Sequence, residues 1–358
     1  MQILEVCIII CIFAENRMIM EKKPTLALIA ERTGYSVSTV SRVLNSRDDN
    51  CRISAKVAEA IRVEAERCNY PTRSLAQILQ KSRTRTIGVV LPSVVNPFFA
   101  EICEAILKEA IGRGYSSIVA VTMENADEQA ACISTLMAKK VDGILAAPCG
   151  NDSELFENLN NTLPVVFVDR FFIGKDIPYV TSNNYKGAYD ATMMLINSGH
   201  RNIACVQGDM RSLPNKRRVE GFRNAMKAAD LLDNAVVVGD EFSTQSGYLE
   251  AKLLLSRENR PTAIFALSYT LALGVMQATR DSSLVVGKDV SVISFDDNIS
   301  LDYMQPPLTR VNQVTEEMGK LATKILIGRI EGTYDKVPQL ELNTELIVRD
   351  SVAAVSAE

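Results

Sequence analysis

The sequence predicts a mixed α/β protein, with a small all-α head at the N-terminal end and a larger body of two lobes built on parallel β-sheets. Two observations support this prediction. Residues 25–69 show only the apolar spacing of helices. From Thr86 onward, short apolar runs rich in β-branched residues alternate with segments of helical length, which is typical of βαβ units.

The head contains three segments whose apolar residues recur at spacings of three and four. These helices are expected at Thr25–Arg32, Ser38–Asn45 and Ala55–Arg67. Ser36 and Ser54 precede the second and third segments, where residues that cap a helix N-terminus belong. We therefore expect a compact three-helix unit.

The body contains eight apolar runs that are continuous rather than alternating, which indicates parallel sheets buried on both faces. A body of about 270 residues is too large for one such sheet, so two lobes in tandem are expected. The runs cover residues 87–91, 117–121, 143–147, 164–169, 202–207, 235–240, 263–267 and 290–297.

The composition is that of an ordinary globular protein, with 47% hydrophobic and 23% charged residues. Eight cysteines without a CxxC pair suit a reducing compartment, and with His200 as the single histidine they argue against a metal site. One histidine also weakens the case for a Ser-His-Asp hydrolase. The sequence has no GxGxxG after the first strand, no phosphate loop and no GxSxG motif, so we expect neither an enzyme nor a cofactor.

The charges are distributed unevenly along the chain. Residues 21–86 carry 13 Lys or Arg against 7 Asp or Glu, whereas the remainder carries 26 against 36. A basic head on an acidic body is expected when only one end of a protein meets phosphate groups.

Residues 1–20 include the apolar run Val6–Ala14, which is far shorter than the roughly 18 residues of a membrane span. The run lacks the preceding positive charge of a secretory signal. We interpret these residues as an upstream extension, with Met18 or Met20 as the natural start. The alternative is a short buried or anchoring segment.

Residues Ile29–Asn45 read as a helix, a tight turn at Gly34 and a second, capped helix. Gly34 supplies the permissive backbone of the turn. Val40, Val43 and Leu44 would face inward on the second helix, which leaves small or polar residues outward. The N-terminal residues of such a second helix enter the DNA major groove in helix-turn-helix proteins.

Two motifs carry a family resemblance: TVSRVLN after GYS at residues 34–45, and NYPTRSLAQIL at residues 69–79. With the α/β body that follows them, they resemble the LacI/GalR family of transcription regulators from Lys23 to about Val352. The resemblance implies a DNA-binding head and a two-lobed body like that of periplasmic binding proteins. It also implies a homodimer in the cytoplasm, with double-stranded operator DNA and a small effector as partners and no membrane.

The resemblance also assigns the DNA contacts. Val37 and Ser38 match the family's base-reading positions; Val37 could meet a thymine methyl group, and Ser38 discriminates weakly between bases. A leucine in the family's hinge helix wedges into the minor groove, and Leu79 matches it. An amphipathic linker packed on the body is the alternative for this segment. The remaining contacts fall at Thr39, Ser41, Arg42 and Asn45.

The head departs from the family pattern in two places. The loop Ser46–Ile53 is longer than usual, and its acidic residues at 48 and 49 would point away from phosphate. The hinge proline occurs one position early, at Pro71, which leaves the register of the hinge uncertain.

Polar and aromatic side chains follow the predicted strands at the point where each strand ends. Ligands of open α/β sheets bind outside the carboxyl ends of strands. Carboxylates, amides and guanidinium groups bond directionally to hydroxyls, and an aromatic face packs on a sugar ring. Each residue alone has a structural explanation, such as helix capping or core packing, but their convergence predicts an effector site. Its eight residues are Asn96, Phe98, Asp169, Arg170, Asn183, Arg218, Tyr269 and Asp296.

The resemblance places inducer contacts at the same positions, among them residues 96–98, Asp169, Asn183, Arg218 and Asp296. Tyr269 stands where relatives often have an aspartate, so this chain lacks one acceptor for vicinal hydroxyls. An anionic sugar derivative facing Arg170 or Arg218 is therefore our hypothesis, next to a neutral sugar.

Together these observations predict a DNA-binding transcription regulator, expected to be a repressor, whose operator affinity a sugar or sugar acid controls. A sugar receptor without gene control is the alternative, but it has no use for the basic head. The expected parts are the extension 1–20, the helix-turn-helix domain 21–70, and the hinge and linker 71–85. The first lobe is expected at 86–182 and 313–339, and the second at 183–312 and 340–358.

Overall fold

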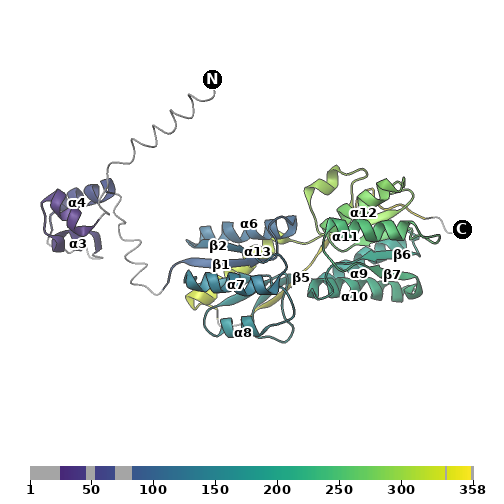
Figure 1. Cartoon of the computed structure of the whole chain (residues 1–358), viewed down its shortest axis with the longest axis horizontal. Helices are drawn as coiled ribbons and strands as arrows, with labels where there is room; N and C mark the ends of the chain where they lie inside the picture. The colour runs from purple at the N-terminus through teal and green to yellow at the C-terminus, as the bar shows by residue number, and fades with distance from the viewer. Residues whose placement is uncertain (1–24, 46–52, 69–82, 335–336, 356–358) are drawn as a thin grey trace, which may run out of the picture. The chain divides into compact units, whose positions relative to one another are not determined.

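The computed structural model describes residues 25–45, 53–68, 83–334 and 337–355. The chain divides between Thr84 and Arg85 into two compact units (Figure 1). Three predictions lie outside the described residues: the extension 1–20, most of the loop Ser46–Ile53, and the wedge Leu79 with its hinge helix.

The head consists of three helices, α2 (Leu26–Thr33), α3 (Val37–Asn45) and α4 (Ala55–Arg67). Thr25 is the N-cap of α2, because its side chain accepts a hydrogen bond from the Leu28 N–H at 3.2 Å. Helix α2 ends at Gly34, whose φ of 74° lies in the left-handed region. The prediction that Gly34 forms the turn is therefore confirmed.

The head buries a small apolar core to which all three helices contribute. Val40 and Leu44 of α3 are buried and Val43 is partly buried, as predicted for the inner face. They pack against four residues of α2 and α4: Ile29, Ala30, Ile61 and Ala65. This packing fixes which face of α3 points to solvent.

The first lobe of the body is a six-stranded sheet in which every neighbouring pair is parallel. The strand order is β11-β5-β4-β3-β1-β2, with bounds Gln339–Leu342, Tyr179–Ser182, Val165–Val168, Gly143–Ala146, Thr86–Leu91 and Ser116–Val121. Helices α6 (Pro97–Gly112) and α13 (Thr315–Glu331) cover one face. Helices α7 (Ala126–Ala138) and α8 (Glu154–Asn160) cover the other face (Figure 1).

The second lobe repeats this design with strand order β12-β10-β9-β8-β6-β7. The strand bounds in that order are Glu345–Ile347, Thr309–Asn312, Ser291–Phe295, Ala263–Ala266, Ile203–Val206 and Ala235–Val238. Helices α9 (Asn184–Asn197) and α10 (Leu213–Ala228) pack on one face, and α11 (Thr244–Leu255) and α12 (Tyr269–Asp281) pack on the other. Short 3₁₀ helices occupy Leu232–Asn234 and Ile299–Tyr303. The pairing of β12 with β10 is antiparallel.

Successive residues of a central strand enter different cores, which confirms that the sheets are buried on both faces. In β1, Ile87 and Val89 join the core under α6 and α13, whereas Val90 joins the core under α7 and α8. The alternation follows from the two-residue period of a strand. It explains why the run is apolar at every position.

The chain passes between the lobes three times, near residue 183, near residue 313 and at residues 343–344. The first two passages agree with the predicted lobe bounds. The third corrects the predicted boundary after residue 339, because β11 pairs with β5 of the first sheet as far as Leu342. Strand β11 lies at a sheet edge and alternates exposed and partly buried residues, so it lacks the continuous apolar signal.

Helices α11 and α12 pack with their backbones close together at two glycines. A β-carbon built on Gly274 would lie 2.2 Å from the Thr244 carbonyl oxygen, and one on Gly247 would lie 2.5 Å from the Leu271 carbonyl oxygen. Neither neighbour is the end of a flexible side chain. The contact therefore requires glycine at both positions.

We expect Gly274→Ala to lower the free energy of unfolding by about 2 kcal/mol, because the added methyl group forces the two helices apart. Gly112→Ala is the matched control, since its β-carbon would have no atom within 4 Å and alanine favours helix formation. Chemical denaturation of both variants measures the difference. Equal stability of the two variants would contradict this account of the packing.

Candidate functional site

The outward face of α3 presents a compact set of small, polar and basic groups. Val37 has 48% of its surface exposed, Ser38 and Arg42 are exposed, and Thr39 and Ser41 are partly exposed. Asn45 ends the helix, and its side chain lies outside the described residues. The predicted DNA-contacting residues of α3 whose side chains the structure describes thus share one face of the head.

Ser36 organises the start of this helix. Its hydroxyl oxygen accepts a hydrogen bond from the Thr39 N–H at 3.2 Å and lies 2.8 Å from the hydroxyl oxygens of Ser38 and Thr39. The predicted N-cap is therefore confirmed, and it holds two hydroxyls next to the exposed methyl groups of Val37. Such a surface can contact base edges and methyl groups, while Arg42 can pair with phosphate.

Six of the eight predicted effector residues line one cavity between the two lobes: Asn96, Phe98, Asp169, Arg170, Arg218 and Asp296. They come from the carboxyl ends of β1, β4 and β9 and from α6 and α10. The other lining residues are Phe99, Glu124, Ser212, Pro214, Phe242 and Ser268. The convergence expected from the strand ends is present in the structure.

Arg218 is the central cation of this cavity and is only 4% exposed. Its Nε donates to the Asn184 side-chain oxygen at 2.7 Å, and its Nη1 donates to the Leu267 carbonyl oxygen at 2.7 Å. Nη1 also lies 3.6 Å from an Asp296 carboxylate oxygen, and the guanidinium carbon lies 3.8 Å from the ring centre of Phe295. Burial lowers the pKa of Arg218, against the opposing effect of Asp296 and Asp169. These contacts fix its orientation.

Asp296, at the end of β9 in the second lobe, contacts the segment near residue 313 where the chain passes between the lobes. One carboxylate oxygen accepts a hydrogen bond from the Gln313 side-chain amide at 2.6 Å, and the other accepts from the Tyr269 N–H at 3.1 Å. The residue has a φ of 74°, in the left-handed region that aspartate tolerates better than most residues. Backbone strain of this kind is concentrated at functional sites.

Asp169 contributes a buried carboxylate from the first lobe. It is 4% exposed, and its Oδ1 has no hydrogen-bond partner among the described residues. Burial raises its pKa to about 6, although the nearby cations of Arg218 and Arg170 oppose the rise. Its φ of 63° is also in the left-handed region. An acceptor left without a partner in a cavity wall is suited to a ligand hydroxyl.

Arg170 is neutralised by Glu124, a residue that the sequence analysis missed. The two guanidinium NH2 groups donate to the two Glu124 oxygens at 2.5 and 2.7 Å. Burial works against the charge of Arg170, but the bonds to Glu124 outweigh it and raise the pKa. Glu124 closely follows β2, so the strand-end argument could have found it.

Two predicted effector residues do not line this cavity. Asn183 caps α9 by accepting a hydrogen bond from the Lys186 N–H at 3.0 Å, and it borders a different cavity of about 300 Å³. Its neighbour Asn184 instead contacts Arg218. The ring of Tyr269 packs against the second lobe's core, and its hydroxyl oxygen lies 3.0 Å from that of Ser300. Tyr269 therefore reaches the site through its backbone N–H alone.

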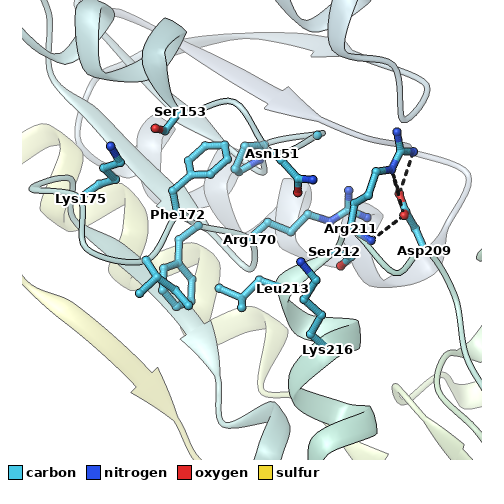
Figure 2. Close-up of a pocket in the computed structure, with 14 residues that line it drawn as sticks. Asn151, Ser153, Arg170, Phe172, Lys175, Asp209, Arg211, Ser212, Leu213 and Lys216 are labelled. Carbon is cyan, nitrogen blue, oxygen red and sulfur yellow. Dashed lines mark hydrogen bonds and ion pairs between the residues drawn. The ribbon is translucent and has the colours of Figure 1, made fainter.

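The cavity has a volume of only about 30 Å³, far below the several hundred Å³ of typical ligand pockets. A second cavity of about 270 Å³ adjoins it and shares Arg170 and Ser212 in its lining (Figure 2). Occupation by a sugar-sized molecule therefore requires movement of the lobes or of lining side chains.

The helices in the described parts of the chain include none with the length and apolarity needed to cross a membrane.

Comparisons with known proteins agree with this architecture. Residues 192–352 match a family model described as a periplasmic binding protein-like domain. The ribose operon repressor of Escherichia coli (strain K12) is 35% identical over 332 residues, which cover 91% of this chain and 99% of the relative. The HTH-type transcriptional repressor PurR of Vibrio vulnificus is 31% identical, over 93% of this chain and 99% of the relative.

Solved structures show the same similarity. The lac repressor dimer bound to operator and the anti-inducer ONPF has a TM-score of 0.81 at 26% identity, covering 93% of this chain and all of that one. A LacI family transcriptional regulator from Enterococcus faecium with bound ribose has a TM-score of 0.69 at 25% identity, covering 76% of this chain and all of that one.

The raised pKa of Asp169 predicts a stability effect of definite sign. Because the folded-state pKa of about 6 exceeds the ordinary value of 3.8, the folded protein holds this proton more tightly, and stability is lost as pH rises through that interval. The free energy of unfolding of Asp169→Asn, measured relative to that of the unchanged protein, should therefore rise by about 2 kcal/mol as the pH is raised from about 4.5 to about 7.5.

Denaturant unfolding at several pH values measures this gain. Asp302→Asn is the control of opposite sign, because hydrogen bonds from Arg310 and Arg349 lower the pKa of Asp302 to about 2. That variant should lose stability at neutral pH, and its deficit should shrink as pH falls below 3.8. A pH-independent difference for Asp169→Asn would contradict the burial argument.

Proposed function

This chain belongs to the LacI/GalR family of transcription regulators, and we propose that it is a repressor whose affinity for operator DNA is controlled by a small polyhydroxy effector. The observation that carries the proposal is the outward face of α3. Val37, Ser38 and Arg42 are exposed on a helix whose opposite face is fixed in the head's core. A helix presented in this way fits the DNA major groove.

The DNA contacts divide by chemistry. We assign Val37 and Ser38 to base edges, and Thr39, Ser41 and Arg42 to the backbone and neighbouring bases. Asn45 and the wedge Leu79 complete this assignment by family resemblance. The basic charge of residues 21–86 supports it, because phosphate neutralisation supplies much of the affinity for DNA.

The effector is assigned to the cavity around Arg218. Carboxylates at Asp169 and Asp296 accept hydrogen bonds from hydroxyls, Asn96 and Arg218 fix orientation, and Phe98 offers a ring. The unpartnered Oδ1 of Asp169 is the group with the most to gain from a ligand hydroxyl. The similarity to the regulator with bound ribose supports a sugar-sized ligand.

Control of DNA binding follows from linkage between two sites. The cavity walls come from both lobes, so an effector that binds there changes the free energy of lobe closure. In a homodimer, closure changes the spacing of the two heads and hence operator affinity. By reciprocity, operator DNA changes effector affinity by the same factor.

We further propose that the chain acts in the cytoplasm, where its operator is, and that it catalyses no reaction. His200, the single histidine, supports the second point. It is 2% exposed, its Nδ1 lies 2.9 Å from the Thr262 hydroxyl, and its Nε2 lies 2.9 Å from the Ser291 hydroxyl. The ring thus serves packing within the second lobe.

We expect Arg42→Ala to weaken binding to a promoter fragment about tenfold, because one phosphate contact is lost. The slope of the logarithm of the binding constant against the logarithm of salt concentration should become shallower by about one. Fluorescence anisotropy at several salt concentrations measures both quantities. Arg62→Ala is the control, since Arg62 is an exposed arginine on α4, outside the recognition helix. Equal effects of the two substitutions would contradict the assignment of α3 as the helix that binds DNA.

We expect Asp296→Asn to weaken effector binding at least about tenfold, because a charged acceptor for hydroxyls is replaced by a neutral one. Asparagine tolerates the left-handed backbone and keeps one acceptor oxygen for the Gln313 amide, but the Tyr269 N–H loses its acceptor, so thermal unfolding is measured to check that the variant is folded. DNA binding without effector should be unchanged. Asp190→Asn on the surface of α9 is the control, and calorimetry with a panel of sugars is the measurement.

A further inference from the structure

The cavity of about 270 Å³ beside the effector site is lined by four basic side chains: Arg170, Lys175, Arg211 and Lys216 (Figure 2). Arg170 and Lys175 belong to the first lobe, and Arg211 and Lys216 belong to the second. Asp209 is the acidic residue in the lining. The cavity is therefore a basic recess between the lobes.

Three of these cations are already neutralised. Lys175 lies 2.7 Å from a Glu157 carboxylate oxygen, and Arg170 is held by Glu124. Arg211 pairs with Asp209 at 3.0 Å, as the dashed lines of Figure 2 show. Lys216 forms no ion pair among the described residues, so it supplies the unbalanced charge of the recess.

Lys216 is exposed, and its charge adds to that of a helix N-terminus. It lies at the start of α10, a helix of 16 residues with no acidic residue in its first turn. The helix dipole places partial positive charge at this end, and the first N–H groups lack partners within the helix. The helix end and the Lys216 ammonium therefore place positive charge at the same point, which favours an anion there.

Ser212 gives an independent indication of a ligand. It is the N-cap residue of α10, yet its side chain makes no capping hydrogen bond. The residue is only 8% exposed and lines both the recess and the effector cavity. A hydroxyl without a capping bond, on a nearly buried residue at the junction of two cavities, is a donor suited to a ligand oxygen.

We propose that the recess is a subsite for the anionic group, a phosphate or a carboxylate, of an effector whose hydroxyl-bearing part occupies the cavity around Arg218. Lys216, the Ser212 hydroxyl and the N-terminus of α10 receive the anion from the second lobe. Lys175, which is paired with Glu157, lines the recess from the first lobe. The inference rests on the proposed function and names the class of effector.

This subsite revises the hypothesis that Arg170 or Arg218 receives the anion. Arg170 is satisfied by Glu124, and Arg218 is satisfied by Asn184, Leu267 and Asp296. An anion at either guanidinium would have to displace a buried partner, which carries a large desolvation cost. Lys216 requires no such exchange.

Calorimetry with D-ribose, D-ribonate and D-ribose 5-phosphate, together with ³¹P titration of inorganic phosphate, tests the subsite on the full-length protein. We expect at least one anionic sugar to bind more tightly than ribose, and inorganic phosphate to bind saturably. Lys216→Gln should weaken the binding of these anions about tenfold or more while leaving ribose binding unchanged. Comparison of the carboxylate with the phosphate identifies which anion fits.

Two further variants control the result. Lys227→Gln removes the same charge from the last turn of α10, away from the recess, and should leave anion binding unchanged. Lys216→Arg keeps the charge and should restore much of the binding. Anion affinity that does not depend on Lys216, or the absence of saturable anion binding, overturns the subsite.

The same samples are assayed for binding to the promoter fragment without effector. Retained, Arg42-dependent DNA binding with failed anion binding rejects only the subsite. Loss of DNA binding in the unchanged protein rejects the proposed function itself.

Discussion

The buried guanidinium of Arg218 is the group on which the geometry of the cleft depends. It extends from α10 and is fixed by Asn184, the Leu267 carbonyl and Asp296, all in the second lobe. The Asp169 carboxylate of the first lobe lies in its field and is stabilised by it, although burial still raises the pKa of Asp169 to about 6. When the lobes close, attraction between Arg218 and Asp169 lowers the free energy, whereas the loss of water around the same charges raises it. Because these contributions oppose each other, a ligand that supplies hydrogen bonds to Asp169 can shift the balance.

The surroundings of this charge cluster are closely packed, which allows a small change at the cleft to be transmitted. Each sheet is buried on both faces, and its strands deliver Asp169 and Asp296 directly from buried backbone. Gln313, which donates to Asp296, lies at a passage of the chain between the lobes and leads into α13 of the first lobe. A change at Asp296 therefore reaches the first lobe through a direct hydrogen bond. Packed interfaces of this kind move between discrete arrangements rather than deforming continuously.

Much of the candidate site could be predicted because the rule that locates it is local. Parallel strands of an open α/β sheet present their carboxyl ends to one edge, so Asn96, Asp169 and Asp296 could be selected from the residues that follow apolar runs. The errors have physical reasons. Asn183 and Asn184 are adjacent, and only the path of the chain into α9 decides that the first caps the helix and the second meets Arg218. Tyr269 packs its ring against the core, where its hydroxyl oxygen lies 3.0 Å from that of Ser300, and no local pattern indicates that orientation.

The sequence by itself determined the three helices of the head, the eight continuous apolar strands of the lobes, the inner face of α3 and the turn at Gly34, but not the strands β5, β10, β11 and β12. These features follow from the spacing of apolar residues and from the backbone preferences of residues such as glycine, and both depend only on residues close together in the sequence. Only the tertiary structure decided which charges neutralise one another. Glu124 and Arg170 are 46 residues apart in the chain yet form two hydrogen bonds, whereas Lys216 has no carboxylate partner in the part of the chain that the structure describes. Ion pairing acts over a few ångströms between strand ends and helix ends that the fold brings together, and no spacing in the sequence encodes that distance.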